Sequence, residues 1–302
     1  MENDLSLGAA WMNGTVIPIS QAKIPVNDWG LVHSDITYDV VPVIDGAFFR
    51  FDEYLARFLS SMENLHLDPG MNKRDIQAAL HQMVSKSSLR DSYVAMVCSR
   101  GKPKIAGSRD PRDCENHFFA WCVPYVHIIK PEIVEQGATA WIAQNAYRIP
   151  ENSVNPRVKN YHWGDFTQGI FEAKDKNYET VILLDYDGNV TEGPGFNVFA
   201  VKDKVLITPD RGVLAGVSRK TVLEMAEHLG INTSVRSLSV EELLEADEVF
   251  LSSSGGGVIP IIRVNETIFG NGASGPISVQ LNETYWKWTT LEKYRDPIDY
   301  AL

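Results

Sequence analysis

The sequence predicts an α/β protein with two domains: a smaller N-terminal domain over residues 1–129 and a larger C-terminal domain over residues 137–302. Three observations support this prediction. The chain has 302 residues, which is enough for two domains of ordinary size. Short apolar runs bounded by turn residues alternate with stretches of helical periodicity along the whole chain. Residues 130–136 separate the two series of elements and are the best candidate for a linker.

The N-terminal half is predicted to start with hairpins, because Asn-Gly at residues 13–14 and Asp-Gly at residues 45–46 interrupt short apolar runs. Residues 51–67 then show helical spacing. Their apolar stripe consists of Tyr54, Leu55, Phe58, Leu59 and Met62. The elements expected after it are a second helix at about residues 75–85 and strands at residues 92–99 and 117–129, separated by a polar, basic loop.

The C-terminal half continues this alternation. A hairpin is predicted over residues 196–209, with its turn at Asp203, and a helix over residues 216–230, with Gly230 just after its end. The other expected elements are a strand at 137–145, a helix near 166–175, a strand at 179–185, further elements leading up to 250–260, and a final helix with Tyr285, Trp286 and Trp288.

Composition narrows the class of protein. The formal net charge of −11 disfavours nucleic acid or an anionic membrane as the main partner, so an anionic ligand must be held by local groups. The three cysteines, Cys98, Cys114 and Cys122, lack metal-ligand spacing, which predicts no metal site and a reducing compartment. No apolar stretch is long enough for a signal peptide or a membrane helix, and we therefore expect a soluble, cytoplasmic protein.

The segment NPRVKNYHWGDF, residues 155–166, places Lys159 among apolar and aromatic neighbours, namely Val158, Tyr161 and Trp163. A lysine attacks carbonyl groups only when burial or a neighbouring charge lowers its pKa, and such neighbours can supply burial. The alternative is a surface lysine whose aliphatic stem lies on apolar side chains.

Glu192 stands in the segment DGNVTEGPGFNVFAV, residues 187–201, directly before Gly193 and close to Gly195. Glycines allow a flat ligand to approach the backbone closely, and a carboxylate in this place can pair with a cationic ring nitrogen. A β-bulge with a solvated glutamate is the alternative.

Two further segments offer donors for an anion. Gly216, Val217 and Ser218 open an amphipathic helix, so that free amide groups and the positive end of the helix dipole suit a phosphate. The hydroxyls and glycines of SSSGGGV, residues 252–258, can also wrap a phosphate. The alternatives are a plain helix start capped by Ser218 and a flexible glycine turn.

Arg57 lies at the edge of the apolar stripe of residues 51–67, where its side chain can reach inward toward an anion. Taken together, these segments describe one ligand. It has an aldehyde for Lys159 and an aromatic cation for Glu192. It also has a phosphate for Arg57, Ser218 and Ser254. Pyridoxal 5′-phosphate carries all three groups.

With these motifs, the sequence resembles the class IV pyridoxal-phosphate aminotransferases over nearly its whole length, from about Trp11 to Tyr294. The strings VKNYHWGDF, NVTEGPGFNVF, TPDRGVLAGVSRK and SSSGGGVIPI come in the order and spacing of that family. The string HSDITYDV, residues 33–40, is most similar to the (R)-selective amine transaminases. The resemblance implies an α/β (α+β) fold, with a smaller N-terminal α/β domain and a larger C-terminal domain that holds a pseudo-barrel of strands. It also implies a homodimer.

The resemblance implies roles for individual residues. Lys159 matches the catalytic lysine, which forms a Schiff base with the cofactor and moves the substrate proton. Glu192 matches the partner of the pyridinium nitrogen, and Leu214 the residue packed on the ring. The residues expected to contact the phosphate, or to lie in the segments that do, are Arg57, Gly216, Val217, Ser218, Ser253 and Ser254.

The expected reaction moves the amino group of an (R)-amine or a D-amino acid to a keto acid such as pyruvate. The residues expected to line the substrate pocket are His33, Tyr38, Val40, Tyr93, Ala95, Arg109 and Trp163. Two positions depart from the amine transaminases: Ala95 replaces a glutamate, and Ala106 replaces the arginine that grips the substrate carboxylate. Arg109 is the nearest candidate for that grip.

Other functions stay open as alternatives. A branched-chain or D-amino acid aminotransferase and an aminodeoxychorismate lyase belong to the same family. A non-catalytic pyridoxal-phosphate carrier is disfavoured, because a carrier gains little from Glu192. A nucleotide site at SSSGGG is also disfavoured, because the sequence lacks a G-x-G-x-x-G or P-loop string.

Overall fold

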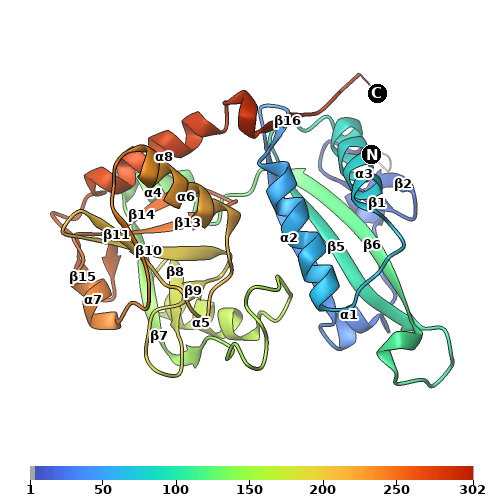
Figure 1. The fold of residues 1–302 in the computed structure, drawn as a ribbon, viewed down its shortest axis with the longest axis horizontal. Coiled ribbons are helices and arrows are strands. Elements are labelled where there is room, and N and C mark those ends of the chain that lie inside the picture. Colours follow the sequence, from blue (N-terminus) through green and yellow to red (C-terminus); the bar gives the residue numbers. More distant parts are fainter. Residues whose placement is uncertain (1–3, 302) are drawn as a thin grey trace. The chain divides into compact units, whose positions relative to one another are not determined.

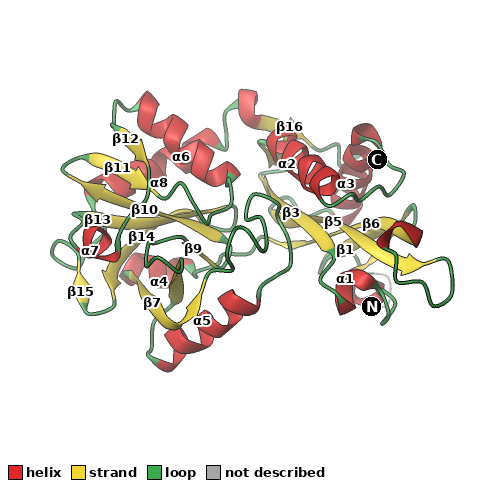
Figure 2. Cartoon of the chain, turned by 60° about the horizontal axis from the view of Figure 1, so that its bottom comes forward, coloured by secondary structure: helices red, strands yellow, loops and turns green. Residues whose placement is uncertain are grey.

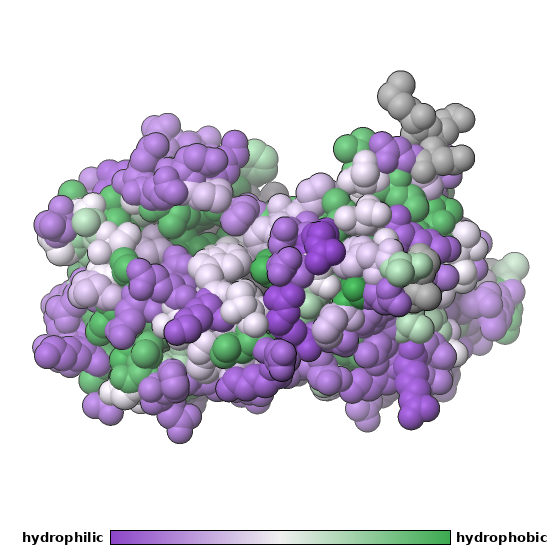
Figure 3. All heavy atoms as spheres, turned by 90° about the horizontal axis from the view of Figure 1, so that it is seen from above, coloured by the Kyte–Doolittle hydropathy of each residue, from purple (hydrophilic) through white to green (hydrophobic). Residues whose placement is uncertain are grey.

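The structure is a computed structural model that describes residues 4–301. The chain forms two compact units, shown as ribbons in Figures 1 and 2. The first unit consists of Met1–Val126, Val158–Tyr161 and Leu291–Leu302, and the second of His127–Arg157 and His162–Thr290. Within residues 4–301, none of the helices is both long and apolar enough to cross a bilayer. Figure 3 shows hydrophilic side chains over most of the face in view, with apolar ones in scattered groups.

This division differs from the one expected from the sequence. The first long segment of unit 1 ends at Val126, and residues 130–136 are no linker, since α4 (Pro131–Gln136) in the second unit occupies them. Residues 158–161, with Lys159, and residues 291–302 both belong to the first unit. Periodicity along a chain identifies elements but not the unit to which a returning segment attaches, which explains the difference.

The first unit contains a seven-stranded sheet in the order β16-β4-β3-β5-β6-β1-β2, in which all neighbouring strands are antiparallel. Its strands are β1 (Ala9–Met12), β2 (Thr15–Pro18), β3 (Ile36–Ile44), β4 (Ala47–Phe49), β5 (Ser92–Pro103), β6 (Cys114–Pro124) and β16 (Arg295–Pro297). Its helical elements are η1 (Ile19–Gln21), α1 (Trp29–Val32), α2 (Phe51–Asn64), α3 (Lys73–Ser87), η2 (Pro111–Asp113) and η3 (Glu292–Tyr294). The expected hairpins are confirmed: Asn13-Gly14 and Asp45-Gly46 have positive φ and join β1 to β2 and β3 to β4.

The sheet of the first unit has two unlike faces, because successive side chains of a strand point to opposite sides. One face packs beneath α2, as the edge-to-face contact of Phe58 with Phe118 shows. The opposite face carries aromatic and small side chains that the strand register places next to one another. We call it the tyrosine face and define it by Tyr38, Val40, Tyr93, Ala95, Phe119 and Trp121.

The second unit contains a nine-stranded sheet in the order β12-β11-β10-β13-β14-β7-β8, with β15 on β14 and β9 on β10. Its strands are β7 (Ala138–Tyr147), β8 (Thr180–Leu184), β9 (Glu192–Gly193), β10 (Phe196–Lys202), β11 (Val205–Thr208), β12 (Thr233–Val235), β13 (Glu248–Ser253), β14 (Gly257–Val264) and β15 (Thr267–Ile268). The sheet curls into half a barrel, as the expected pseudo-barrel requires. Apolar side chains that include Ile142, Val198 and Leu251 form its core.

The helices of the second unit, besides α4, are α5 (Gly164–Asp175), α6 (Val217–His228), α7 (Val240–Leu244) and α8 (Pro276–Trp288). The predicted hairpin over residues 196–209 is confirmed, with Asp203 and Lys204 in the left-handed region between β10 and β11. The predicted helix at 216–230 is α6, and Gly230 follows its end with a φ of 69°. The start of α6 therefore falls in the segment 216–218, where the sequence predicts an anion site.

Candidate active site

Lys159 lies in the segment 158–161, which pairs with the edge of β3 that β4 leaves uncovered. Asn160 forms an antiparallel bridge with Thr37 of β3. The Thr37 hydroxyl donates to the Lys159 carbonyl oxygen at 2.6 Å, and the Lys159 amide donates to Ser61 Oγ of α2 at 3.2 Å. The backbone of the lysine is thus fixed from both sides.

The amine of Lys159 lies over an aromatic ring. Its Nζ is 4.6 Å from the centroid of the Tyr38 ring, and that ring stacks on Tyr161 at 4.0 Å with an interplanar angle of 4°. Lys159 and Tyr161 are half-buried. The ring face attracts the protonated amine. The sequence expected an aromatic environment for Lys159, and Tyr161 supplies it together with Tyr38, which is distant in sequence.

Tyr38 and Tyr161 lie beside this lysine, and Tyr93 lies on the same face of the sheet as Tyr38. Burial raises the pKa of Tyr93 and of Tyr161 well above the ordinary value of a phenol, and the nearby Tyr38 raises both further. These two phenols therefore stay protonated near neutral pH and can donate hydrogen bonds. Val40 and Ala95 are buried on the same face, directly opposite each other in the register of β3 and β5.

Arg57 of α2 points toward the sheet, as expected, but its partner in the structure is a carboxylate. Its Nε donates to Asp39 Oδ2 at 2.7 Å and its Nη2 to Asp39 Oδ1 at 2.6 Å. The Arg57 side chain is 12% exposed and that of Asp39 is 0% exposed. Burial acts to lower the pKa of Arg57, but the charge and hydrogen bonds of Asp39 outweigh it and raise the pKa. Asp39 fixes the guanidinium in one orientation.

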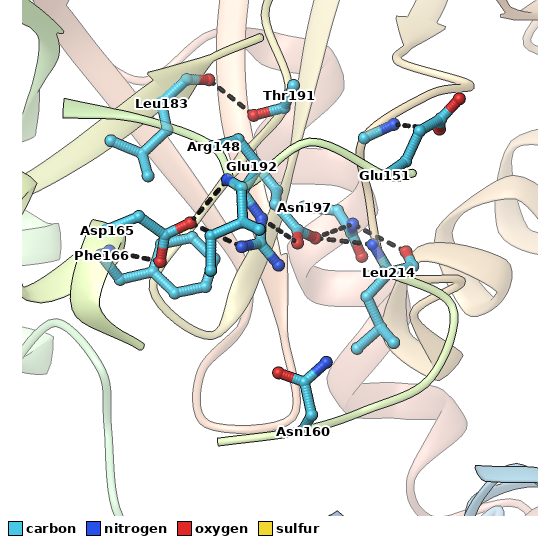
Figure 4. Close-up of polar contacts among 12 residues, drawn as sticks. Arg148, Glu151, Asn160, Asp165, Phe166, Leu183, Thr191, Glu192, Asn197 and Leu214 are labelled. Carbon is cyan, nitrogen blue, oxygen red and sulfur yellow. Dashed lines mark hydrogen bonds and ion pairs between the residues drawn. The ribbon is translucent and has the colours of Figure 1, made fainter. Parts of the chain in front are cut away.

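Glu192 lies in the second unit at the centre of a buried polar network, drawn in Figure 4. Arg148 Nε donates to its Oε1 at 3.2 Å, and the Leu214 amide donates to its Oε2 at 2.8 Å. Asn197 Nδ2 also donates to Oε2, at 3.3 Å. Arg148 in turn donates through Nη1 to Asp165 Oδ2 at 2.6 Å. A carboxylate held in this way can hold a proton on a cationic ring nitrogen.

The sequence suggested that Gly193 allows a flat ligand to approach the backbone, but the structure gives another reason for a glycine at this position. A Cβ on Gly193 would lie 2.2 Å from Phe196 Cζ and 2.3 Å from the Val181 carbonyl oxygen. Gly193 is therefore required by packing within the protein, and no ligand needs to approach it. The short strand β9 pairs Glu192 with Asn197 and so directs the carboxylate toward its donors.

The starting end of α6 is open to an anion. Gly216 is its N-cap residue, and none of the described side chains caps this end. Ser218 lies inside the helix, with its Oγ 3.4 Å from the Tyr285 hydroxyl. It is therefore not the N-cap residue, as a plain helix start capped by Ser218 would require. A Cβ on Gly216 would lie 2.2 Å from Asn197 Oδ1. Asn197 therefore adjoins both the Glu192 carboxylate and the helix start.

The loop of residues 252–258 is packed, which contradicts a flexible turn. The Ser253 hydroxyl donates to the Gly195 carbonyl oxygen at 2.8 Å and accepts from the Gly255 amide at 3.1 Å, so its role in the structure is to shape the loop. Gly257 has a φ of 67°, and a Cβ there would lie 2.8 Å from the Tyr285 ring. The buried Ser252 hydroxyl has no partner among the described residues.

The structure brings together only part of the expected substrate pocket. Tyr38, Val40, Tyr93 and Ala95 share the tyrosine face. His33 is exposed after α1, where its ring contacts Trp29, and Arg109 is exposed in the loop between β5 and β6. Trp163 belongs to the second unit and packs on Phe166.

Four polar residues of these networks escaped the sequence analysis: Asp39, Arg148, Asp165 and Asn197. The sequence could have indicated Asp39, because a carboxylate inside the apolar strand TYDVVPVI must be paired when it is buried. Arg148 and Asp165 gave none, because their pairing joins the end of β7 to the start of α5. Among the described residues, no group of three His, Cys, Asp or Glu side chains could hold a metal ion.

Comparison with known proteins identifies related chains. The model of the family "Amino-transferase class IV" matches residues 37–264. A Methanocaldococcus jannaschii protein assigned as a branched-chain-amino-acid aminotransferase is 28% identical over 278 residues, which cover 91% of this chain and 94% of that one. The D-alanine aminotransferase of Bacillus licheniformis is 28% identical over 273 residues, with coverage of 88% and 92%.

A solved structure gives the same result. The branched-chain aminotransferase of Thermoproteus uzoniensis with norvaline superposes with a TM-score of 0.87 at 26% identity and covers 96% of this chain and 99% of that one. The chain therefore belongs to the class IV aminotransferases, the family that the sequence resembles. It is an enzyme that transfers amino groups, and the cofactor of its family is pyridoxal 5′-phosphate.

The residues present fit this cofactor. Glu192 is a buried carboxylate that accepts hydrogen bonds from Arg148 and from the Leu214 amide, an arrangement that suits the partner of a protonated ring nitrogen. The uncapped start of α6 offers backbone N–H groups to a phosphate. Asn197 adjoins both places. Lys159, in the first unit, is half-buried.

Proposed function

We propose that this enzyme transfers the amino group of an amino acid with an aliphatic side chain to a keto acid, as a branched-chain amino acid aminotransferase does. The sequence resemblance favoured (R)-amines as substrates. The relatives described above instead include enzymes named for branched-chain amino acids and for D-alanine, at similar identity over the whole chain. These names support an amino acid as the donor more strongly than a simple amine.

The observation that carries the proposal is the composition of the tyrosine face beside Lys159. Val40 and Ala95 form an aliphatic wall, and Tyr38 and Tyr93 flank it along their strands. Burying an aliphatic side chain against such a wall stabilises the complex by about 0.8 kcal/mol for each methylene group. We propose that this wall receives the substrate side chain.

The site residues divide the work of the reaction. Bound pyridoxal 5′-phosphate supplies the electron sink that makes the substrate Cα–H acidic. Lys159 Nζ would hold the cofactor in the resting enzyme. Once the amino group of the substrate has displaced it, the freed amine would take the Cα proton as a base and deliver it as an acid. Glu192, held by Arg148, Asn197 and the Leu214 amide, keeps the proton on the ring nitrogen.

The phosphate and the ring are assigned to further residues. We propose that the α6 amides of Val217 and Ser218, the loop with Ser254 and the guanidinium of Arg57 hold the phosphate, and that Leu214 packs on the ring. The Leu214 amide donates to Glu192, so Leu214 lies beside the residue that we propose as the partner of the ring nitrogen. Ser253 is proposed to act indirectly by shaping the loop, since its hydroxyl donates to the Gly195 carbonyl oxygen and accepts from the Gly255 amide.

Arg109 is proposed to bind the carboxylate of the keto acid, because it is exposed on a long loop and can reach an anion. Arg112 in the same loop is held by Asp110 and provides a matched control. We expect Arg109→Ala to raise the KM for the keto acid, and Arg112→Ala to leave it within about twofold. Equal KM values in both variants and the wild type would remove Arg109 from the site.

We further propose a homodimer in a reducing compartment such as the cytoplasm. Val26, Leu31 and Val32, around α1, are exposed apolar residues next to His33, and covering them would stabilise an interface. All three cysteines are free thiols. Analytical ultracentrifugation tests the dimer: a chain that sediments as a monomer at micromolar concentration contradicts it.

A second candidate function is the transamination of (R)-amines. It is favoured by the string HSDITYDV, residues 33–40. Handedness distinguishes this candidate sharply, because Lys159 moves the proton on one face of the substrate.

A donor panel tests both candidates. We expect L-leucine with 2-oxoglutarate to give the highest kcat/KM, with D-alanine and (R)-1-phenylethylamine as the competing donors and (S)-1-phenylethylamine as the control. Activity with (R)-1-phenylethylamine and pyruvate alone would replace the proposal by its second candidate. Release of pyruvate from 4-amino-4-deoxychorismate without any keto acid would identify a lyase instead.

A further inference from the structure

The first unit contains an apolar pocket that the proposed function does not use. It has a volume of about 340 Å³ and lies between strands β1 and β6 and residues 19–24. Apart from Lys23, its lining is apolar and includes Met12, Ile24, Phe119 and Trp121. Lined in this way, it suits a hydrocarbon chain rather than a polar group.

The pocket begins where the proposed substrate wall ends. Ala95 of β5 lies directly opposite Trp121 of β6, and Trp121 lies directly opposite Ala10 of β1. These three residues therefore stand side by side across the sheet, one on each strand. Adjacent strands are about 4.8 Å apart, so the row spans about 10 Å from the substrate wall to the pocket. Its only large side chain is that of Trp121.

The indole of Trp121 is held in this position by a neighbour that belongs to the lysine site. Its ring stacks on Tyr93 with a centroid distance of 5.6 Å and an interplanar angle of 28°. Tyr93 shares the tyrosine face with Tyr38, and the amine of Lys159 lies 4.6 Å from the centroid of the Tyr38 ring. The order along the face is thus the lysine, the tyrosines, the indole and the pocket.

We propose that Trp121 is a specificity-determining residue that limits the length of the substrate side chain. The inference rests on the proposed function, because it takes Val40 and Ala95 as the wall of the substrate side chain. The indole separates that wall from the apolar pocket and restricts the enzyme to short side chains. Without the indole, Ala95, an alanine at 121 and Ala10 would form an open groove that leads into the pocket.

The test compares Trp121→Ala with the wild type on straight-chain donors of rising length: 2-aminobutyrate, norvaline, norleucine, 2-aminooctanoate and 2-aminodecanoate, in the enantiomer that the enzyme accepts. We expect kcat/KM of the wild type to fall for the longest donors. In Trp121→Ala it should rise by about fourfold for each methylene that enters the groove, or about 60-fold for three methylenes. Activity with 2-aminobutyrate should change by a much smaller factor than activity with the longest donors.

Matched variants separate the opening of a passage from a mere gain of space. Met12→Ala enlarges the pocket on β1 but leaves the indole in place, so it should keep the length profile of the wild type. Trp121→Leu opens the passage in part and serves if the alanine variant fails to fold. A Met12→Ala profile equal to that of the Trp121 variants would overturn the proposal.

Binding of the unreactive carboxylates butanoate, octanoate and decanoate, measured by calorimetry, gives the same comparison without turnover. Tighter binding of decanoate by Trp121→Ala than by the wild type supports the proposal, and equal binding overturns it. A wild type that transaminates none of the amino acids would refute the proposed function while this binding comparison still stands. The two failures are therefore distinguishable.

Discussion

The lysine site of the first unit and the Glu192 site of the second unit are built in opposite ways. Around Lys159, the contacts of the backbone are neutral hydrogen bonds to Thr37 and Ser61, and the amine lies on the ring of Tyr38. Around Glu192, every donor described above points at the carboxylate itself, and one of them is the charged Arg148.

This difference corresponds to two kinds of work. A group that carries a proton must change its charge and move during the reaction, and an aromatic ring face attracts its protonated form. A group that stabilises a charge must not move, and prearranged donors keep it from reorganising. The substitutions below disrupt one site or the other, in order of decreasing expected effect on the enzyme.

Lys159→Ala removes the mobile group and should have the largest effect. We expect turnover to fall by at least about 10⁴-fold, because the base and the covalent link to the cofactor are lost together. The visible absorption band of the cofactor-loaded enzyme should shift to that of unlinked cofactor. Lys174→Ala, which removes an exposed lysine, is the control and should retain both. Turnover like that of the wild type would refute the assignment of the whole site.

Glu192→Gln removes the fixed charge and keeps the shape. A neutral amide cannot hold the proton on the ring nitrogen, and a loss of about 3 to 4 kcal/mol in transition-state stabilisation lowers kcat roughly a few hundredfold. Cofactor binding should persist, since the α6 amides are untouched. Steady-state kinetics with cofactor titration checks this, and a kcat within about threefold of the wild type would contradict it.

Arg57→Ala should mainly weaken retention of the cofactor. It removes one charge-assisted contact to phosphate, worth about 1.5 to 3 kcal/mol, or roughly 10- to 150-fold in Kd. The buried Asp39 then loses the guanidinium that pairs with it, so Arg57→Ala/Asp39→Asn should recover stability but not retention. Dialysis followed by cofactor quantification measures retention, and thermal melts measure stability. Equal retention in wild type and Arg57→Ala would assign Arg57 a purely structural role.

Tyr38→Leu should have the smallest effect of the series. It removes the aromatic surface beneath the amine and the stack on Tyr161, interactions worth about 0.5 to 1.5 kcal/mol. We expect kcat to fall by about two- to tenfold, with cofactor retention unchanged. Tyr38→Phe keeps the ring and should stay close to the wild type. A Tyr38→Phe variant as slow as Tyr38→Leu would show that the hydroxyl matters and the ring does not.

The sequence predicted most elements because their signals are local. The hairpin turns at Asn13-Gly14 and Asp45-Gly46 require residues that tolerate positive φ, and the stripe of α2 follows helical spacing. Lys159 and Glu192 stood out for the same reason, since each lies in an unusual string of neighbours. The family comparison then agreed with the resemblance that these strings carry.

What the sequence could not predict depends on pairs that are distant along the chain. Arg148 and Asp165 each look like ordinary surface charges, and only the fold makes them a buried pair. Gly193 and Ser253 were assigned to a ligand, whereas the structure uses one for packing and the other to fix a loop. The stack of Tyr93 on Trp121 also joins two strands that no sequence pattern pairs.

The attachment of residues 158–161 to the first unit has a consequence for the order of folding. The hydrogen bonds that seat Lys159 reach back 122 residues to Thr37 and 98 residues to Ser61. Contacts between such distant residues form late, because a long loop must close first. The edge of β3 and helix α2 must therefore exist before the lysine can take its place, and a fragment of residues 127–290 would hold the lysine without its seat. Catalytic competence should thus appear as one of the last events in the maturation of the chain.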